Sequence, residues 1–266
     1  MPTMLLAAIA ALTFLIVPSP AQAQKIKGMT FVALDVSSLC TDCSVVQASG
    51  EFTDDTIKAY YDFIWRGRFK KNIYFIFDSP GGSLHEALRL GEIMRTLKVN
   101  TIVGRAYLRN GEVEIEPGRC ASACVFAFIG GVTRSMPEKS TLGVHSWMPA
   151  VVLPQEGRKS KEKPKLLSQE IVERLHRQTA SCLKYIDAMG VDLRLSVLIL
   201  QTPYNRISWV SSRDQKLWSL VTIDSSLNTR AGRRWPVLFL PRPTDPVPLP
   251  AGQADARPLN HNGASL

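Results

Sequence analysis

The stretch Asn72-Ile73-Tyr74-Phe75-Ile76-Phe77-Asp78-Ser79-Pro80-Gly81-Gly82-Ser83 decides the fold. Residues 73–77 form an unbroken run of β-branched and aromatic side chains, which is typical of a strand buried on both faces. The Ser-Pro-Gly-Gly turn ends that strand, and apolar residues then recur at helical spacing from Leu84 to Leu97. A β-like segment follows at residues 101–103. This strand–helix–strand order predicts a parallel sheet with right-handed crossovers, and therefore an α/β domain.

Elements of the same kinds are expected on both sides of this unit. Before it we expect two strands and an amphipathic helix, at residues 29–36, 44–48 and 53–64, with Thr53 as the N-cap of the helix. After it we expect a loop or hairpin at residues 105–118 and a strand end at 142–145. A basic loop or lid at 154–164 and a long helix at 171–189, which ends at Gly190, are expected to follow.

The N-terminus carries the pattern of a cleaved export signal. Residues 4–17 form an apolar run, and Ala21-Gln22-Ala23 follows soon after. An apolar run before an A-x-A sequence is typical of a secretory signal, and this run falls short of the about 20 residues that span a bilayer. We therefore expect cleavage after Ala23 and a periplasmic or secreted protein. The alternative is a protein anchored in the membrane by an uncleaved N-terminal segment.

The C-terminus is rich in proline. Prolines recur from Pro241 to Pro258, which prevents regular helix or sheet and favours an extended, largely disordered tail. The chain is therefore expected to consist of a signal peptide at 1–23, one domain at 24–227 and a proline-rich tail at 228–266.

The charge of the chain raises the question of nucleic-acid binding. Its 266 residues include 32 Lys and Arg against 23 Asp and Glu, a formal net charge of +9. The excess lies in three segments, 66–71, 156–165 and 228–266. No basic strand interleaved with aromatic residues and no recognition helix accompanies them, so we expect no nucleic-acid partner. A solvated face and two flexible segments explain the charge, which also favours association with an anionic membrane surface.

The five cysteines are Cys40, Cys43, Cys120, Cys124 and Cys182, and export allows them to form disulfides. The Cys40-Thr41-Asp42-Cys43 sequence fits a redox pair, a metal half-site or a local disulfide. No second CxxC and no histidine at ligand spacing accompanies it, so we expect no metal. Cys120 and Cys124 either brace the segment between them through disulfides or fill a tightly packed helix start. The odd number leaves at least one thiol free or paired between chains.

Three local features fit hydrolase chemistry when they are taken together. Gly81-Gly82 lies between a buried strand and a helix, where backbone N–H groups approach a ligand closely. Ser122 stands among small residues at an expected helix start, and His145 follows a strand-like Leu-Gly-Val. Alone, these residues also fit a tight turn, an N-cap and a hydrogen-bonded histidine. Together they supply oxyanion donors, a nucleophile and a base, which a serine hydrolase requires.

The same residues resemble a known family. Asp78-Ser79-Pro80-Gly81-Gly82, Ala121-Ser122-Ala123 and Gly143-Val144-His145 are similar to motifs of the proteolytic subunit of Clp protease. They are more closely similar to exported, Clp-protease-like proteins of bacteria that are described as periplasmic. The resemblance covers about residues 31–222. It implies a ClpP/crotonase-like ββα superhelix with a stacked parallel sheet, and it allows a homo-oligomer such as a trimer or larger ring.

By this resemblance, Ser122 is the nucleophile and His145 the general base. The backbone N–H groups of Gly82 and Ala123 form the oxyanion hole, with Gly81 beside them. The family's Asp has no counterpart here, because the matching Thr202-Pro203-Tyr204-Asn205-Arg206 segment contains no carboxylate. Asn205 or a backbone carbonyl is left to orient the imidazole of His145.

These observations support functions of different classes. The first is an exported serine hydrolase, a peptidase that acts on a peptide or protein without a cofactor. The second is a non-catalytic binding or assembly protein of the cell envelope, which the missing Asp favours and the retained Ser122 and His145 oppose. A crotonase-type acyl-CoA enzyme shares the fold, but export argues against it because CoA is a cytosolic cofactor.

Overall fold

The computed structural model describes residues 28–36, 42–109, 112–147 and 169–223. The expected signal peptide at 1–23, the basic loop at 154–164 and the proline-rich tail at 228–266 lie outside the described residues and stay predictions. No helix in the described part of the chain is long and apolar enough to cross a membrane.

A five-stranded sheet forms the centre of a mixed α/β fold. Its order is β1 (Thr30–Leu34), β2 (Cys43–Ser49), β3 (Asn72–Asp78), β4 (Asn100–Val103) and β8 (Arg134–Ser135). Neighbouring strands from β2 to β8 are parallel, and β1 pairs antiparallel with β2. The predicted α/β class and parallel sheet are therefore confirmed, with an antiparallel strand added at one edge.

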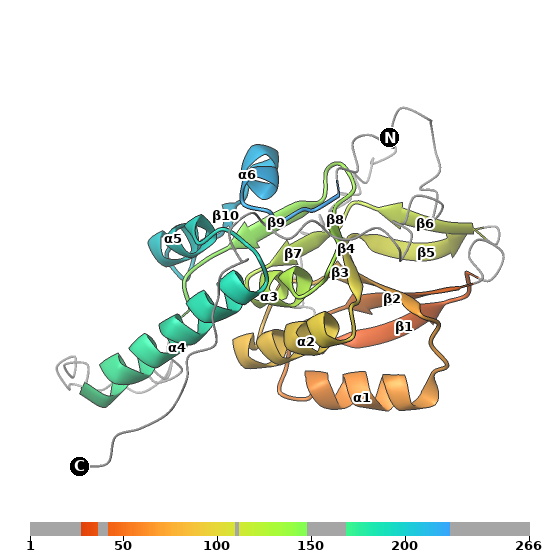
Figure 1. The fold of residues 1–266 in the computed structure, drawn as a ribbon, viewed down its shortest axis with the longest axis horizontal. Helices are drawn as coiled ribbons and strands as arrows, with labels where there is room; N and C mark the ends of the chain where they lie inside the picture. The colour runs from red at the N-terminus through yellow and green to blue at the C-terminus, as the bar shows by residue number, and fades with distance from the viewer. Residues whose placement is uncertain (1–27, 37–41, 110–111, 148–168, 224–266) are drawn as a thin grey trace, which may run out of the picture.

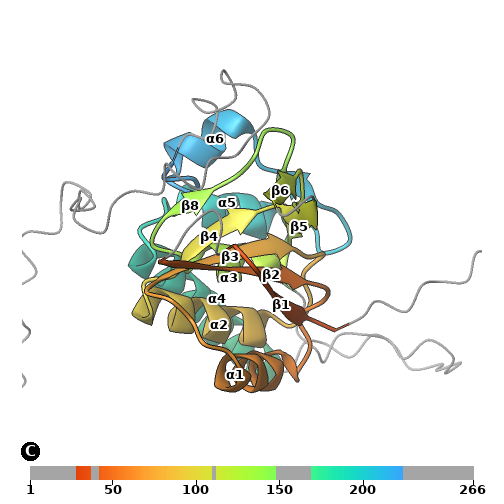
Figure 2. The same ribbon diagram turned by 90° about the vertical axis from the view of Figure 1, so that its right-hand side faces the viewer.

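The alternating side chains of β3 lie in two separate hydrophobic clusters. Phe75 and Phe77 belong to the larger cluster, which the helices α1 (Thr56–Arg66) and α2 (Leu84–Thr96) help to form. Tyr74 and Ile76 belong to a smaller cluster that packs against the hairpin of β5 (Arg105–Arg109) and β6 (Glu112–Glu116). Figures 1 and 2 show the helices on one side of the sheet and the hairpin on the other. Of the two alternatives for residues 105–118, the hairpin is the one that forms.

The start of α1 differs from the expectation that Thr53 is its N-cap. The N-cap residue is Asp55, whose side chain makes no capping hydrogen bond. Instead, the carboxylate of Glu86 on α2 accepts a hydrogen bond from the backbone N–H of Ile57 at 2.9 Å. A buried side chain from the neighbouring helix thus satisfies one of the free N–H groups at this helix terminus.

A three-stranded sheet carries the sequence motifs around Ser122 and His145. Its order is β10 (Ser208–Trp209), β9 (Thr141–Val144) and β7 (Arg119–Ala121). β7 and β9 run parallel, with Ala121 opposite Gly143, and β10 runs antiparallel to β9. Ser122 is the single residue between β7 and the wholly buried helix α3 (Ala123–Ile129).

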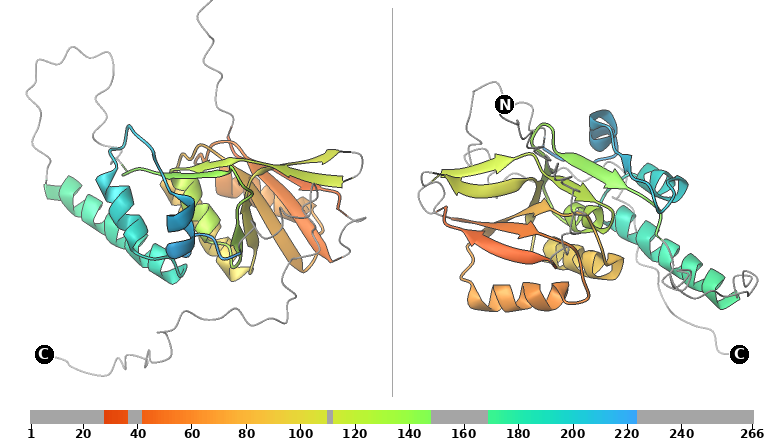
Figure 3. Two further views of the ribbon diagram at one scale, coloured as in Figure 1. Left: turned by 90° about the horizontal axis from the view of Figure 1, so that it is seen from above. Right: turned by 180° about the vertical axis from the view of Figure 1, so that it is seen from behind.

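Three helices complete the described chain: α4 (Gln169–Ala188), α5 (Arg194–Gln201) and α6 (Ser212–Leu217). The predicted long helix is present as α4, and Gly190 with φ of +66° follows it. The C-terminal half of α4 is anchored because the buried Tyr185 hydroxyl donates to the Phe126 carbonyl at 2.6 Å. Its N-terminal end projects away from the sheets (Figure 3).

Candidate active site

Ser122 has an unusual backbone conformation for a residue with a side chain. Its φ of 56° and ψ of −124° lie in a region that L-residues rarely adopt, at a cost of about 1–3 kcal/mol. Its N–H donates to the Gly143 carbonyl at 2.8 Å, and its carbonyl accepts from the Val125 N–H at 3.1 Å. The Ser122 side chain makes no capping bond, so it is not the ordinary N-cap that the sequence also allowed. A sharp strand-to-helix turn of this kind exposes the nucleophile in many hydrolases.

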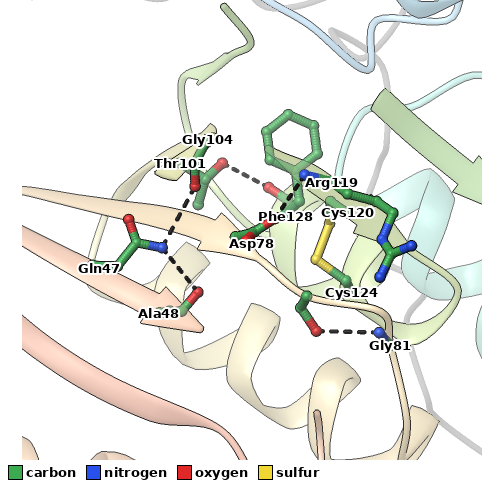
Figure 4. The surroundings of a disulfide bond; sticks show 11 residues. Gln47, Ala48, Asp78, Gly81, Thr101, Gly104, Arg119, Cys120, Cys124 and Phe128 are labelled. Carbon is green, nitrogen blue, oxygen red and sulfur yellow. Dashed lines mark hydrogen bonds between the residues drawn. A yellow bond between two sulfur atoms is a disulfide. The ribbon is translucent and has the colours of Figure 1, made fainter. Parts of the chain in front are cut away.

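The Cys120–Cys124 disulfide brackets Ser122. It links β7 to the first turn of α3 (Figure 4). Both cysteines are completely buried. Of the two alternatives for this pair, the disulfide is the one that forms. Because the cysteines are only four residues apart, closing so short a loop stabilises the folded chain by about 2 kcal/mol. The stabilisation by the disulfide is therefore similar in size to the energetic cost of the strained backbone at Ser122.

Two further cysteines, Cys43 and Cys182, lie among the described residues and belong to other elements. Cys43 takes part in a disulfide, and Cys182 on α4 is a buried free thiol. Burial raises the pKa of the Cys182 thiol to about 11. Among the described residues, no group of three or more His, Cys, Asp or Glu side chains gathers at a spacing that could hold a metal ion.

The Ser79–Gly82 turn lies directly against the turn at Ser122. The Ser79 N–H donates to the Arg119 carbonyl at 2.7 Å, and the Ala121 N–H donates to the Ser79 carbonyl at 3.1 Å. Gly81 has a φ of +110°, and a Cβ added to it would stand 2.6 Å from the Cβ of Ser122. Only glycine therefore allows this approach, and the two turns form one packed unit.

Two backbone N–H groups near Ser122 have no acceptor in the described part of the chain. The Phe52 N–H donates to the Gly81 carbonyl, and the Phe52 carbonyl accepts from the Ser83 N–H. The N–H of the exposed Gly82, which lies between these two residues, makes no hydrogen bond to the described chain. Ala123 is the first residue of α3, so its N–H has no partner within the helix. Gly82 directly follows Gly81, and a Cβ added to Gly81 would stand 3.1 Å from the Ala123 nitrogen, so the two predicted oxyanion donors belong to backbone segments that pack against each other. Unpaired N–H groups of this kind can stabilise a developing oxyanion.

His145 directly follows β9, the strand that pairs with β7. Its Nδ1 lies 2.7 Å from the carbonyl oxygen of Ser146. A carbonyl only accepts hydrogen bonds, so Nδ1 carries the proton and a neutral imidazole keeps Nε2 free as an acceptor. The segment is fixed in turn because the Ser146 N–H donates to the Thr202 carbonyl at 2.8 Å. The sequence allowed a backbone carbonyl to orient the imidazole of His145, and the Ser146 carbonyl is in a position to do so.

The remaining predicted contacts do not form. Asn205 is exposed in the turn after α5 and makes no hydrogen bond to His145 or to any other described residue. Within the described residues, Ser122 Oγ and His145 also share no hydrogen bond, although the two residues follow adjacent strands. Catalytic hydrogen bonds are often long without substrate and shorten only when it binds. The Ser146 carbonyl had no sequence signal, because every residue has one.

Comparison with known proteins does not assign the chain to a family. No family model matches the chain, and no curated protein matches its sequence. Among solved structures, a ClpP1 mutant from Listeria monocytogenes is a weak neighbour, with a TM-score of 0.42 and 14% identity over 66% of this chain and 88% of that chain. The protein is a mixed α/β protein, and a likeness at this level assigns it neither a family nor an activity.

Proposed function

We propose that this protein is an exported serine hydrolase of the Clp-protease-like type, a peptidase that uses Ser122 as nucleophile and His145 as general base. The observation that carries the proposal is the strained turn at Ser122, packed against Gly81 and next to the unpaired N–H groups of Gly82 and Ala123. A structural serine needs neither the strain nor two unpaired donors beside it.

The proposed reaction is acyl transfer to Ser122. As Oγ attacks the carbonyl carbon of the substrate, its proton passes to Nε2 of His145. The oxyanion accepts hydrogen bonds from the N–H groups of Gly82 and Ala123. Collapse of this intermediate expels the amine, which takes the proton from His145. Water then hydrolyses the acyl-enzyme by the same steps in reverse roles, and no cofactor is required.

The group that orients His145 sets the expected rate. A carboxylate holds Nδ1–H and also stabilises the imidazolium that forms, whereas the neutral carbonyl of Ser146 holds the proton with much less electrostatic stabilisation. Loss of the orienting acid alone costs several orders of magnitude in comparable enzymes. We therefore propose a slow hydrolase, for which covalent labelling is a better assay than turnover.

The proposal also includes the setting of the domain. We infer a ClpP/crotonase-like ββα superhelix, a periplasmic or secreted location, and assembly as a homo-oligomer, all from the motif resemblance. The membrane-anchored form remains the alternative location. The parallel strands β2, β3, β4 and β8 are compatible with such a superhelix.

A second candidate function is a non-catalytic binding or assembly protein of the cell envelope. One observation favours it: no carboxylate hydrogen-bonds to His145 among the described residues. In that case the turn at Ser122 is retained for its packing, and the protein binds a partner without turning it over.

Labelling with a fluorophosphonate probe distinguishes the two functions. The wild-type protein is expected to label at a single site, and Ser122→Ala is expected to abolish labelling while circular dichroism and the melting temperature stay unchanged. The matched control is Ser181→Ala, an exposed serine on α4 whose replacement should leave labelling intact. An unlabelled wild type, or full labelling of Ser122→Ala, contradicts the hydrolase.

A further inference from the structure

The disulfide next to Ser122 connects the two elements whose junction sets the position of that serine. Cys120 belongs to β7 and Cys124 to α3, and the chain between them is only Ala121, Ser122 and Ala123. The strained φ and ψ of Ser122 lie at the middle of this ring. The cross-link therefore closes a ring that contains Ser122 and only its two neighbours.

The hydrogen bonds around Ser122 do not by themselves require its strained conformation. Its N–H donates to the Gly143 carbonyl and its carbonyl accepts from the Val125 N–H, and each backbone bond of this kind contributes only about 1 kcal/mol. The disulfide is different because it fixes the distance between strand and helix covalently. Its stabilisation of about 2 kcal/mol comes from restricting the unfolded chain, and in the folded state it also ties β7 to the first turn of α3.

We propose that Cys120 and Cys124 are positioning residues, and that the reactivity of Ser122 depends on their being oxidised to the disulfide; this inference rests on the proposed hydrolase function. With the disulfide intact, Ser122 is held against Gly81 and near the N–H groups of Gly82 and Ala123. With the disulfide reduced, the turn relaxes and Ser122 Oγ leaves the position from which it attacks. Small displacements of reacting groups are sufficient for large losses of rate.

The redox step is a dithiol–disulfide exchange. One thiolate of a dithiol reductant attacks one sulfur of the Cys120–Cys124 bond, the S–S bond breaks, the other cysteine leaves as a thiolate, and a mixed disulfide forms with the attacked sulfur. The second thiol of the reductant then displaces that sulfur, so two electrons and two protons reach the cysteines and the reductant leaves as a cyclic disulfide. Both cysteines are completely buried, so the reductant requires a local opening of the turn. The oxidised, reactive form is therefore the one that persists in an oxidising compartment.

The test is the fluorophosphonate labelling rate of the full-length protein in three forms: oxidised, reduced with dithiothreitol, and the Cys120→Ala/Cys124→Ala double variant. We expect a loss of about 100-fold in the maximal labelling rate for the reduced and double-variant forms, with half-saturation by the probe unchanged. Reoxidation of the reduced protein should restore the rate. The matched control is Cys182→Ala, which removes an equally buried sulfur outside the disulfide and should label as the wild type does.

Amide hydrogen exchange supplies a readout that does not depend on catalysis. Reduction should increase exchange at Ser122 and Val125, whose N–H groups are hydrogen-bonded in the oxidised protein, and leave β3 protected. Labelling and exchange that are both unchanged on reduction overturn the proposal. Loss of the whole fold also overturns it, because the disulfide is then a general staple. If the oxidised wild type does not label while exchange changes as expected, the hydrolase fails and the positioning of the turn stands.

Discussion

Gly81 combines a left-handed backbone with a lack of space for any side chain. Its φ is +110°, and an added Cβ would stand 2.6 Å from the Ser122 Cβ and 2.7 Å from the Ala121 carbonyl oxygen. Gly190 also has a positive φ, +66°, but no atom of the described chain lies within 4 Å of its Cβ position. The two glycines therefore separate the cost of backbone conformation from the cost of a clash.

Gly81→Ala is expected to lower the free energy of unfolding by about 3 kcal/mol or more, because strain and overpacking add. Gly190→Ala is expected to lower it by about 1 kcal/mol, from strain alone. Urea denaturation measures both, and fluorophosphonate labelling should be lost only for Gly81→Ala. Equal destabilisation by the two substitutions would contradict the close packing of Gly81 on Ser122.

The sequence predicted the neighbours in this site better than their contacts. The glycine turn follows β3 and His145 follows β9, and the ends of both strands are visible in the pattern of residues. Ser122 follows β7, which is not visible in that pattern, so it was predicted from its small neighbours and from the motif resemblance. Backbone atoms carry no such pattern, so the Ser146 carbonyl and the conformation of Ser122 were not predictable. The pairing of Cys120 with Cys124 stayed open because spacing alone does not fix connectivity.

Arg134 on β8 joins the ends of three helices. Its guanidinium is almost completely buried and has backbone carbonyls as partners instead of a carboxylate. These carbonyls follow or end α3, α4 and α6 and belong to Ile129, Gly131, Met189, Ser219 and Leu220. Carbonyl groups at helix C-termini are unpaired and partly negative, so one cation satisfies several of them. Burial lowers the pKa of Arg134 to about 10, and the group remains charged at neutral pH.

Arg134→Lys should lower the free energy of unfolding by about 3 kcal/mol, because a lysine ammonium keeps the charge but cannot make the same set of hydrogen bonds. Arg174→Lys is the control, since Arg174 is exposed on α4 and pairs only with Glu170 in the described chain. Chemical denaturation of both variants is the measurement. A stability loss for Arg134→Lys no larger than that of the control would mean that water replaces the lost bonds.

The elements themselves were predictable in proportion to their length. β3, α2 and α4 show clear periodicity, and the structure has them within a few residues of their expected ends. β7 and β10 have only three and two residues, too few for any period to appear in the sequence. The start of α1 was misjudged because Glu86, which is distant in sequence, supplies the hydrogen bond that a local N-cap otherwise would.

For the whole molecule, the buried Cys182 thiol gives a pH dependence of stability. Its pKa is raised from 9.0 to about 11 in the folded protein, so between these values the unfolded chain releases a proton that the folded chain retains. Rising pH therefore favours unfolding in this window, by at most about 2–3 kcal/mol. Cys182→Ala should show a smaller decrease in stability between pH 9 and pH 11. Parallel pH curves for wild type and variant would contradict this assignment, whatever their difference in absolute stability.

The strand β9 has a consequence for how proteins of this architecture can diverge. Ser122 follows β7 and His145 follows β9, and the pairing of Ala121 with Gly143 sets their separation independently of the chain length between them. Insertions at the turn of residues 137–140 lengthen that chain without altering the ladder. Distant homologues can therefore vary widely in loop length and overall sequence while the two side chains keep the same spacing. A search for relatives by this local geometry should reach further than one by sequence.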